Sequence, residues 1–304
     1  MNADGAVVIA VDGSAHSART VDWGLDEAAS RGARVLVVQA FQEPFVLAWG
    51  WFPGLRDTTR YVGTKRYLAD VRSHVRRQRR GVPVDTRVLY GPPAAALSRL
   101  SRDAQLLVLG ARGRAHPADI GRLVPHLVKH AHCPVAVVGE IAPAAAPVVV
   151  GVDGSPASLD AAHAAALEAQ RRGVELRVLH PRSAGPVAGA RTGTPPGVEG
   201  DRAEPTPREV RAVVDALRAQ HPDLDVRVQP SDDAADALVR SGRDASVVVV
   251  GDRRAGSRAS RLTSVSDELL HQAPCPVLVV RHDHEHPVPR HADDDLRDRA
   301  PERA

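Results

Sequence analysis

Short runs of consecutive apolar residues alternate along the chain with longer stretches in which apolar residues recur every three or four positions. The run Leu106 to Leu109 offers no polar side chain to solvent, which predicts a strand buried on both faces, as in a parallel sheet covered by helices. The longer stretches have helical periodicity, and Gly32 and Gly81 follow two of their ends, where glycine commonly terminates a helix. The pattern predicts an α/β fold of the doubly wound, Rossmann-like class.

The first half of the chain is predicted to contain five strands alternating with four helices. We expect strands at residues 6–11, 34–40, 85–90, 106–109 and 135–138. We expect helices at residues 17–30, 56–80, 94–101 and 121–131. The second half repeats this order, with strands expected at residues 148–152, 175–179, 225–229, 247–250 and 277–280.

The two halves are diverged copies of one unit. VVIAVDGS at residues 7–14 matches VVVGVDGS at residues 148–155, LLVLGARGR around Gly110 matches VVVVGDRRA around Gly251, and the CPV segment at Cys133 matches that at Cys275. Corresponding residues are 141 or 142 positions apart throughout, so the repeat is a whole duplicated domain. We predict a first domain at residues 1–140, a linker at 141–147, a second domain at 148–281 and a disordered charged tail at 282–304.

Composition narrows the classes of function. The 304 residues carry 40 Lys and Arg against 37 Asp and Glu, a balance that does not predict nucleic-acid binding, and the one dense basic run, from Arg72 to Arg80, is predicted to be a solvated helix face. No apolar stretch reaches the ~18 to 20 residues that span a bilayer, and the start lacks the basic region of a signal peptide. We therefore expect a cytoplasmic protein that does not bind membranes. The two cysteines occupy equivalent positions, which favours a packing role.

Candidate ligand-binding residues follow the carboxyl ends of predicted strands, where open parallel sheets bind their ligands. Asp12 ends the first strand, Ala40 the second, and Gly110 and Gly113 follow the fourth. Glycines there let backbone N–H groups approach a phosphate, and a helix beginning at Gly121 adds its partial positive charge. These residues favour an anionic ligand. A tight strand-to-helix turn explains the same glycines without a ligand, and Asp-Gly-Ser is also ordinary turn chemistry.

The VDGS segment, the glycine loop and the CPV segment recur in this order in both copies, and together they resemble the universal stress protein family. The resemblance implies two adenine nucleotide alpha hydrolase-like domains that pair through their last strands as an intra-chain pseudo-dimer. Further self-association and protein partners stay open. It also implies ATP, an adenine nucleotide, as the ligand, with or without Mg²⁺.

By this resemblance, Asp12 would contact the ribose or a metal and Ala40 the adenine edge. The residues that would contact the phosphates are Gly110, Gly113, Gly121 and Arg122. The loop of ATP-binding members reads G-x2-G-x9-G-[S/T], whereas here seven residues, 114–120, separate the second glycine from the third, and Arg122 replaces the hydroxyl residue. An arginine can still bind phosphate through its bidentate fork.

The second copy keeps fewer of these residues. Gly251 is retained, but Arg254 and Thr263 replace the second and third glycines, while Ser264 stands at the hydroxyl position. Asp153 is the counterpart of Asp12. Because a side chain at position 254 would fill space that the backbone amides need, we expect weak nucleotide binding or none in this copy.

Three functions are compatible with these residues. The first is a non-enzymatic, ATP-responsive stress protein in which nucleotide in the first copy alters partner binding. The second is a scaffold of the same family that has lost ATP binding, and the third is a slow ATPase or phosphotransferase. The chain has no G-x-x-x-x-G-K-[S/T] loop, no G-x-S-x-G elbow and no evident catalytic base, so we expect no catalytic residue and no metal site built by side chains alone.

Overall fold

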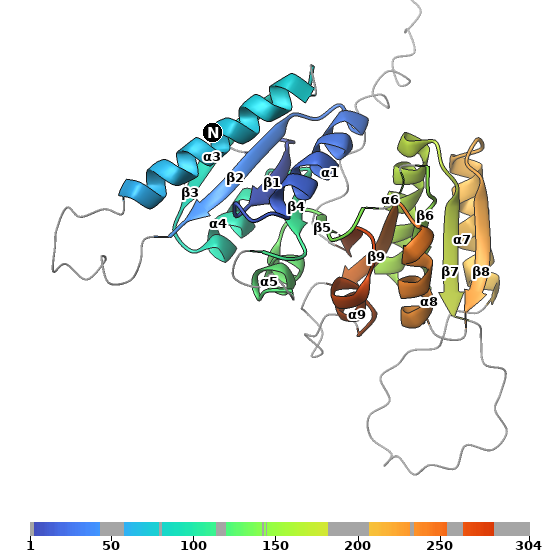
Figure 1. The fold of residues 1–304 in the computed structure, drawn as a ribbon. Coiled ribbons are helices and arrows are strands. Elements are labelled where there is room, and N and C mark those ends of the chain that lie inside the picture. Colours follow the sequence, from blue (N-terminus) through green and yellow to red (C-terminus); the bar gives the residue numbers. More distant parts are fainter. Residues whose placement is uncertain are drawn as a thin grey trace, which may run out of the picture.

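The computed structural model describes residues 3–42, 58–78, 81–113, 120–141, 143, 145–181, 207–231, 234–253 and 264–282. Within these ranges, strands and helices alternate in two equivalent series (Figure 1). Apart from His282, the last residue of a strand, the predicted charged tail lies outside the described residues.

The elements of the first copy are β1 (Val7–Val11), α1 (Ser17–Ser30), β2 (Val35–Phe41), α3 (Thr58–Gln78), β3 (Val84–Tyr90), α4 (Pro93–Leu100), β4 (Leu106–Gly110), α5 (Leu123–His130) and β5 (Val135–Val138). Those of the second copy are β6 (Val148–Gly151), α6 (Pro156–Arg172), β7 (Leu176–Pro181), α7 (Pro207–Gln220), β8 (Val226–Ser231), α8 (Ala234–Ser241), β9 (Val247–Arg253), α9 (Ser264–Gln272) and β10 (Val277–His282), with a short 3-10 helix at Gly242–Asp244. All ten predicted strands are present, and the largest shift of an end is the three-residue extension of β9.

The ten strands form one continuous sheet in the order β3-β2-β1-β4-β5-β10-β9-β6-β7-β8. Neighbouring strands within each five-strand half are parallel. The last strands of the two copies meet at the centre, where β5 and β10 pair antiparallel with Val137 opposite Val277. The structure therefore contains the pairing of last strands that the resemblance implies, and the fold is the doubly wound class that the hydrophobic pattern predicts.

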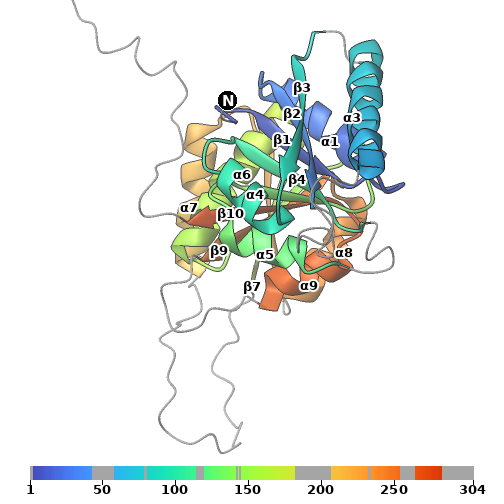
Figure 2. The ribbon, with the colours of Figure 1, turned by 90° about the vertical axis from the view of Figure 1, so that its left-hand side faces the viewer.

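Helices cover both faces of the sheet because successive strand residues point to opposite faces. In β1, Val7 and Ile9 pack on the face covered by α1, α3, α6 and α7, whereas Val8 packs on the face covered by α4, α5, α8 and α9. Figure 2 shows α1 and α3 on one side of the first-copy strands and α4 on the other. An apolar residue at every position of a central strand is thus required by burial on both faces.

Strand order reverses between β1 and β4 in the first copy and between β6 and β9 in the second. In such sheets the ligand-binding crevice lies beyond the carboxyl ends of the strands at this point. Because β5 and β10 run antiparallel, the two copies direct their carboxyl ends toward opposite edges of the shared sheet. The two candidate sites therefore lie apart.

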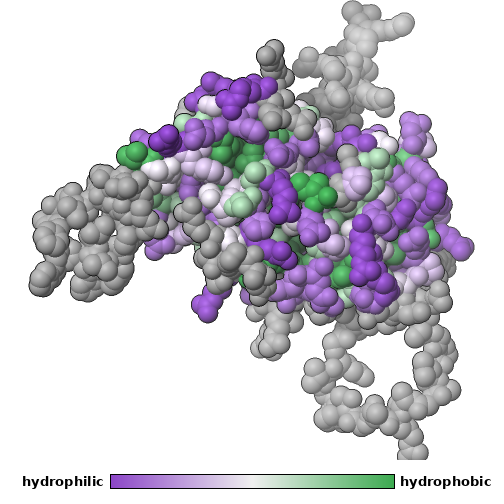
Figure 3. Space-filling model, viewed as in Figure 1, coloured by the Kyte–Doolittle hydropathy of each residue, from purple (hydrophilic) through white to green (hydrophobic). Residues whose placement is uncertain are grey.

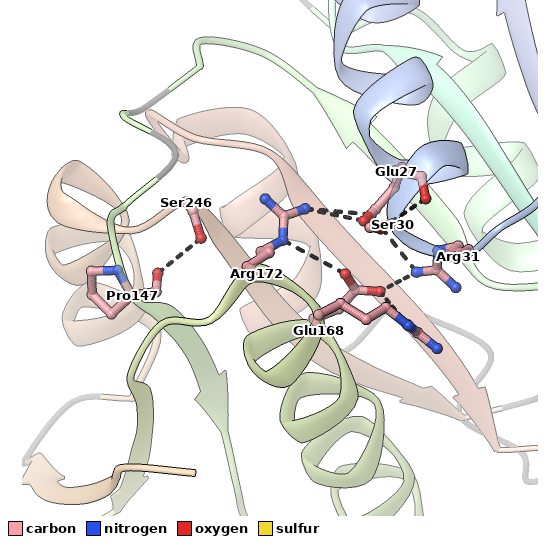
Figure 4. A network of polar contacts seen from close by, with 8 residues as sticks. Glu27, Ser30, Arg31, Pro147, Glu168, Arg172 and Ser246 are labelled. Atoms are coloured by element: carbon pink, nitrogen blue, oxygen red, sulfur yellow. Dashed lines mark hydrogen bonds and ion pairs between the residues drawn. The ribbon is translucent and has the colours of Figure 1, made fainter. Parts of the chain in front are cut away.

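The junction between the copies also contains a buried ion-pair cluster formed by α1 and α6 (Figure 4). Arg172 of α6 donates hydrogen bonds to both carboxylate oxygens of Glu27, at 3.2 and 3.3 Å, and Arg31, the C-cap residue of α1, donates to Glu168. Arg171 adds a 3.1 Å hydrogen bond to Glu168. Both glutamate side chains are about 1% exposed, so charges buried in the junction are neutralised across it.

Hydrophilic side chains dominate the face of the described residues drawn in Figure 3, where hydrophobic residues form small separate areas. The large hydrophobic residues with the greatest exposure are dispersed over the two copies: Val62, Tyr90, Ile141, Leu159 and Val228. Among the helices that the structure describes, none combines the length and the apolar character needed to cross a bilayer.

Candidate functional site

A cavity of about 800 Å³ opens at the carboxyl edge of the first copy, at the point where strand order reverses. It brings together residues that are far apart in sequence. The six residues of the first copy predicted to bind ligand all line it: Asp12, Ala40, Gly110, Gly113, Gly121 and Arg122. A volume of this size lies within the range of roughly 300 to 1,000 Å³ typical of small-molecule sites.

The walls of the cavity differ in character. Phe41, Leu97 and Leu109 contribute apolar surface from β2, α4 and β4. The glycine loop after β4 and the start of α5 contribute backbone groups and two arginines, Arg112 and Arg122. Among the described lining residues, Asp12 is the single carboxylate and Arg112 and Arg122 are cations, so the described charged side chains of the cavity are predominantly positive. An apolar wall next to a cationic, glycine-rich wall suits a ligand with a planar ring system and an anionic group.

Asp12 anchors the turn after β1. Its Oδ1 atom accepts a hydrogen bond from the backbone N–H of Ser14, at 2.9 Å, and another from the Ser17 hydroxyl, at 3.1 Å. The first is the Asx turn expected of Asp-Gly-Ser, and the second ties the turn to the first residue of α1. Asp12 therefore does form the turn that its sequence predicts, and its carboxylate also lies on the wall of the cavity.

Two glycines of the β4 loop stand where a side chain would collide with the wall of the cavity. A Cβ atom on Gly113 would lie 2.8 Å from Oδ2 of Asp12, and a Cβ atom on Gly110 would lie 3.0 Å from the hydroxyl oxygen of the buried Thr20. Both distances are shorter than ordinary van der Waals contacts. Glycine at these positions therefore keeps backbone groups close to Asp12 and to the start of α1.

The base of the glycine loop is closed by an isolated antiparallel bridge between Arg112 and Ile120. This bridge brings Gly113 and Gly121 to the same cavity. The helix that follows begins at Leu123, two residues later than predicted, with Arg122 at the N-cap and no side-chain capping hydrogen bond. Gly121 therefore precedes the helix and belongs to the loop, whereas the sequence predicted that it begins the helix.

The equivalent edge of the second copy is built differently. Asp153 forms the same Asx turn, accepting a 3.0 Å hydrogen bond from the N–H of Ser155. Pro156, at the first helical position, starts α6 two residues earlier than α1 starts in the first copy, and Ser155 caps it by accepting from the N–H of Ser158. The two added residues bring the carbonyl of Ala157 against Gly251, so that any Cβ at position 251 would clash with backbone.

This contact gives Gly251 a packing role that needs no ligand. The next residue, Asp252, is 4% exposed and stands where the first copy has Ala111, which lines the cavity. A buried carboxylate at this position opposes an anionic ligand. Of the other residues compared in the sequence, Ser264 begins α9, and Arg254 and Thr263 lie outside the described residues.

Helix α3 contributes lining residues that the sequence did not single out, namely Gly63, Thr64 and Tyr67. A signal was present, because glycine in a helix interior costs about 1 kcal/mol relative to alanine and usually has a reason. A Cβ on Gly63 would meet no atom within 4 Å, which is consistent with its place beside the open cavity. The polar Thr64 is 9% exposed on the inward side of the same helix.

Both cysteines are buried free thiols, each two residues before a strand, β5 or β10. Burial raises the pKa of Cys133 and of Cys275 to about 12, which keeps both thiols protonated and poorly reactive. These thiols act as small hydrophobic side chains of the core.

Within the described residues, no group of three or more His, Cys, Asp or Glu side chains is arranged to hold a metal ion.

The two equivalent halves define a tandem α/β protein whose fold is of the nucleotide-binding-like type. The profile of the Universal stress protein family matches residues 5–139 and 146–281, and the chain belongs to that family. It is 32% identical over 300 residues to universal stress protein Rv1996 of Mycobacterium tuberculosis H37Rv, over 90% of this chain and 94% of that protein. It is 31% identical over 295 residues to universal stress protein Rv2623 of the same strain, over 92% and 97%.

A solved structure has the same fold along nearly the whole chain. The crystal structure of a universal stress protein from Archaeoglobus fulgidus DSM 4304 has a TM-score of 0.62 at 16% identity, covering 91% of this chain and 98% of that one. At this identity the likeness concerns the fold alone.

Proposed function

We propose that the first copy binds ATP in the cavity between β1 and β4 and that nucleotide occupancy regulates the binding of a partner protein. One observation carries the proposal: six residues from separate segments of the first copy, predicted from strand ends and from the family resemblance, line a single cavity of about 800 Å³. The apolar wall around Ala40 and Phe41 suits a base, and the glycine loop with two arginines suits phosphates.

The proposed roles follow from position on the wall. Asp12 binds the ribose hydroxyls, or a metal ion that arrives with the phosphates, and Ala40 borders the adenine. Phosphate oxygens are bound by the group formed by Gly110, Gly113, Gly121 and Arg122, to which the structure adds Arg112. The close approach of Gly113 to Asp12 supports this arrangement, because a side chain would close the space that the ligand needs.

The second copy acts, in this proposal, as a structural partner. Its glycine-loop edge has the α6 backbone packed against Gly251 and a buried carboxylate at Asp252. Both features disfavour phosphate at the edge formed by Asp153, Gly251 and Ser264. We propose domains at residues 1–140 and 148–281, joined by a linker at 141–147.

We propose a binding protein and not an enzyme. The only carboxylate among the described cavity residues is Asp12, whose Oδ1 atom is held by Ser14 and Ser17, a geometry suited to orientation of a ligand. A reducing compartment is supported by the two unpaired thiols, so we place the protein in the cytoplasm.

The test is a calorimetric titration of the full chain with ATP, with and without Mg²⁺, after nucleotide carried through purification has been removed. We expect saturable binding that is lost when Asp12 is replaced by Ala. The Asp153→Ala variant, altered at the equivalent turn of the second copy, is the matched control and should bind like the wild type. No binding by the wild type would overturn the proposal and would leave a scaffold that works through its surfaces.

A further inference from the structure

Helix α5 of the first copy connects the cavity to the second copy. Its first residues, Leu123 and Val124, line the cavity together with the preceding Gly121 and Arg122. Its other end is bound by the second copy, because Nη1 of Arg281 in β10 donates hydrogen bonds to the carbonyl oxygens of Lys129, at 2.6 Å, and Ala131, at 2.7 Å.

Arg281 binds groups that a helix cannot satisfy by itself. The last carbonyls of a helix have no intrahelical partner and carry partial negative charge. A guanidinium donates hydrogen bonds to these carbonyls and its positive charge stabilises them. Eight residues make a rod of about 12 Å, so a constraint at one end of α5 also fixes the position of the other. The N-terminal end has no side-chain capping hydrogen bond of its own, so contacts elsewhere on the helix must set its position.

Neighbouring contacts reinforce the C-terminal end of α5. The Ser98 hydroxyl of α4 donates a 3.0 Å hydrogen bond to the carbonyl of His130, and Leu127 and Val128 are fully buried. Helix α4 itself borders the cavity through Pro93 and Leu97. The C-terminal end of α5 is thus a fixed point shared by the second copy and by the cavity wall.

The contact has no counterpart in the opposite direction. The residue equivalent to Arg281, 142 positions earlier, is Gly139, and the carbonyl equivalent to that of Ala131 belongs to Ala273. A Cβ on Gly139 would lie 3.9 Å from this carbonyl oxygen, so the geometry is retained but glycine supplies no guanidinium. The second copy therefore binds the C-terminal end of α5 through Arg281. Gly139, the equivalent residue of the first copy, makes no such side-chain contact with the end of α9.

We propose that Arg281 of the second copy is a positioning residue for the nucleotide site of the first copy. By binding the C-terminal end of α5, it fixes the position of the N-terminal end of that helix, where the phosphates would bind. The inference rests on the proposed ATP site. It gives the second copy a role in ligand binding, although its own edge is unsuited to a nucleotide. Coupling is reciprocal, so ATP in the first copy tightens the contact between α5 and β10.

The test compares ATP with adenosine, which shares the base and ribose but has no phosphate, as ligands of the full chain. Arg281→Ala should weaken ATP binding by roughly three- to thirtyfold and leave adenosine affinity unchanged, because only phosphates would meet the displaced helix end. Arg281→Lys, which retains a cation, should recover part of the loss. Arg177→Ala removes an arginine of the second copy that pairs with Glu175, away from α5, and serves as the control.

If Arg281→Ala weakened the binding of ATP and adenosine equally, the inference would be overturned, because the result would indicate general damage to the cavity. An unchanged ATP affinity in this variant would also overturn it. The wild-type titration separately decides whether the ATP site exists. Hydrogen exchange of the wild-type chain gives a second measurement that needs no variant. ATP should slow exchange in α5 and also in β10 around Arg281, and slowing confined to the first copy would contradict the coupling.

Discussion

Glu27 and Glu168 occupy the same position in the two copies, 141 residues apart, and each is bound by an arginine of the other copy. The arginines are themselves equivalent, because Arg31 and Arg172 are also 141 residues apart. The contact made by the first copy is therefore repeated in reverse by the second, which is the property of a two-fold symmetric interface. The duplicated chain thus keeps the contact geometry of a symmetric dimer inside one polypeptide.

We predict that Glu168→Ala lowers the free energy of unfolding by about 3 to 5 kcal/mol, because it leaves buried arginines without their carboxylate. Guanidinium titration of the full chain measures the loss. The matched control is Asp236→Ala, which breaks the exposed ion pair with Arg240 on α8 and should cost no more than about 0.5 kcal/mol. Equal losses in the two variants would show that the cluster does not hold the copies together.

The same cluster predicts a dependence of stability on pH. Burial, and then the neighbouring Glu168, raise the pKa of Glu27 from 4.5 to about 7. Between these values the folded chain holds a proton that the unfolded chain releases. The contribution of this group to stability is complete below pH 4.5 and is lost as the pH rises through about 7.

Glu27→Gln keeps a neutral side chain at every pH and should remove this dependence. Relative to the wild type, we expect the variant to gain about 2 kcal/mol in free energy of unfolding between pH 5 and pH 8. Unfolding titrations across this range give the difference, with Asp236→Asn as the surface control. A constant difference between wild type and variant would mean that Glu27 is ionised throughout.

We predict that Gly113→Ala weakens ATP binding at least tenfold, roughly the loss of one hydrogen bond to a charged group. The added Cβ would lie 2.8 Å from Oδ2 of Asp12 and would displace the loop or the carboxylate. Gly32→Ala is the control for stability, because Gly32 has φ +60 at the end of α1, away from the cavity. That variant should lose about 1 to 2 kcal/mol of stability and keep its affinity for ATP.

Gly251 and Gly110 occupy equivalent positions, and we predict opposite consequences for the same substitution. Gly251→Ala forces a side chain into the backbone of Ala157 and should destabilise the chain by about 3 kcal/mol or more without changing ATP affinity. Gly110→Ala meets the Thr20 hydroxyl at 3.0 Å and the carbonyl oxygen of Arg112 at 3.2 Å, both longer contacts than the clash at Gly251, so it should cost less stability but reduce ATP affinity. Thermal unfolding and titration of the two variants separate the roles, and a loss of ATP affinity in Gly251→Ala would place a ligand in the second copy.

The sequence predicted the strands well because burial on both faces leaves a continuous apolar signal, as in Leu106 to Leu109. Strand ends were less well defined where polar residues continue a strand, as Asp252 and Arg253 do in β9. The apolar pattern predicted Asp12 and Gly110 at strand ends, and the general behaviour of parallel sheets then indicated the edge at which the cavity lies.

Contacts that depend on helix positions were not predicted from sequence. Ser155 and Pro156 are local signals for a helix start, but nothing local indicates that this start would bring Ala157 against Gly251. Nor does anything local indicate that Thr64 of α3 would reach the cavity. The glutamate–arginine cluster did leave a trace, because both charged pairs keep the 141-residue spacing of the repeat. Charged residues at equivalent positions of duplicated helices can therefore indicate a contact between copies.

If one copy binds nucleotide and the other supports that site, the full chain holds a single nucleotide. Native mass spectrometry of the full chain at saturating ATP measures this stoichiometry. We predict one ATP per chain, lost in the Asp12→Ala variant and retained in the Asp153→Ala variant. Two nucleotides per chain, or one that persists without the first-copy site, would contradict it.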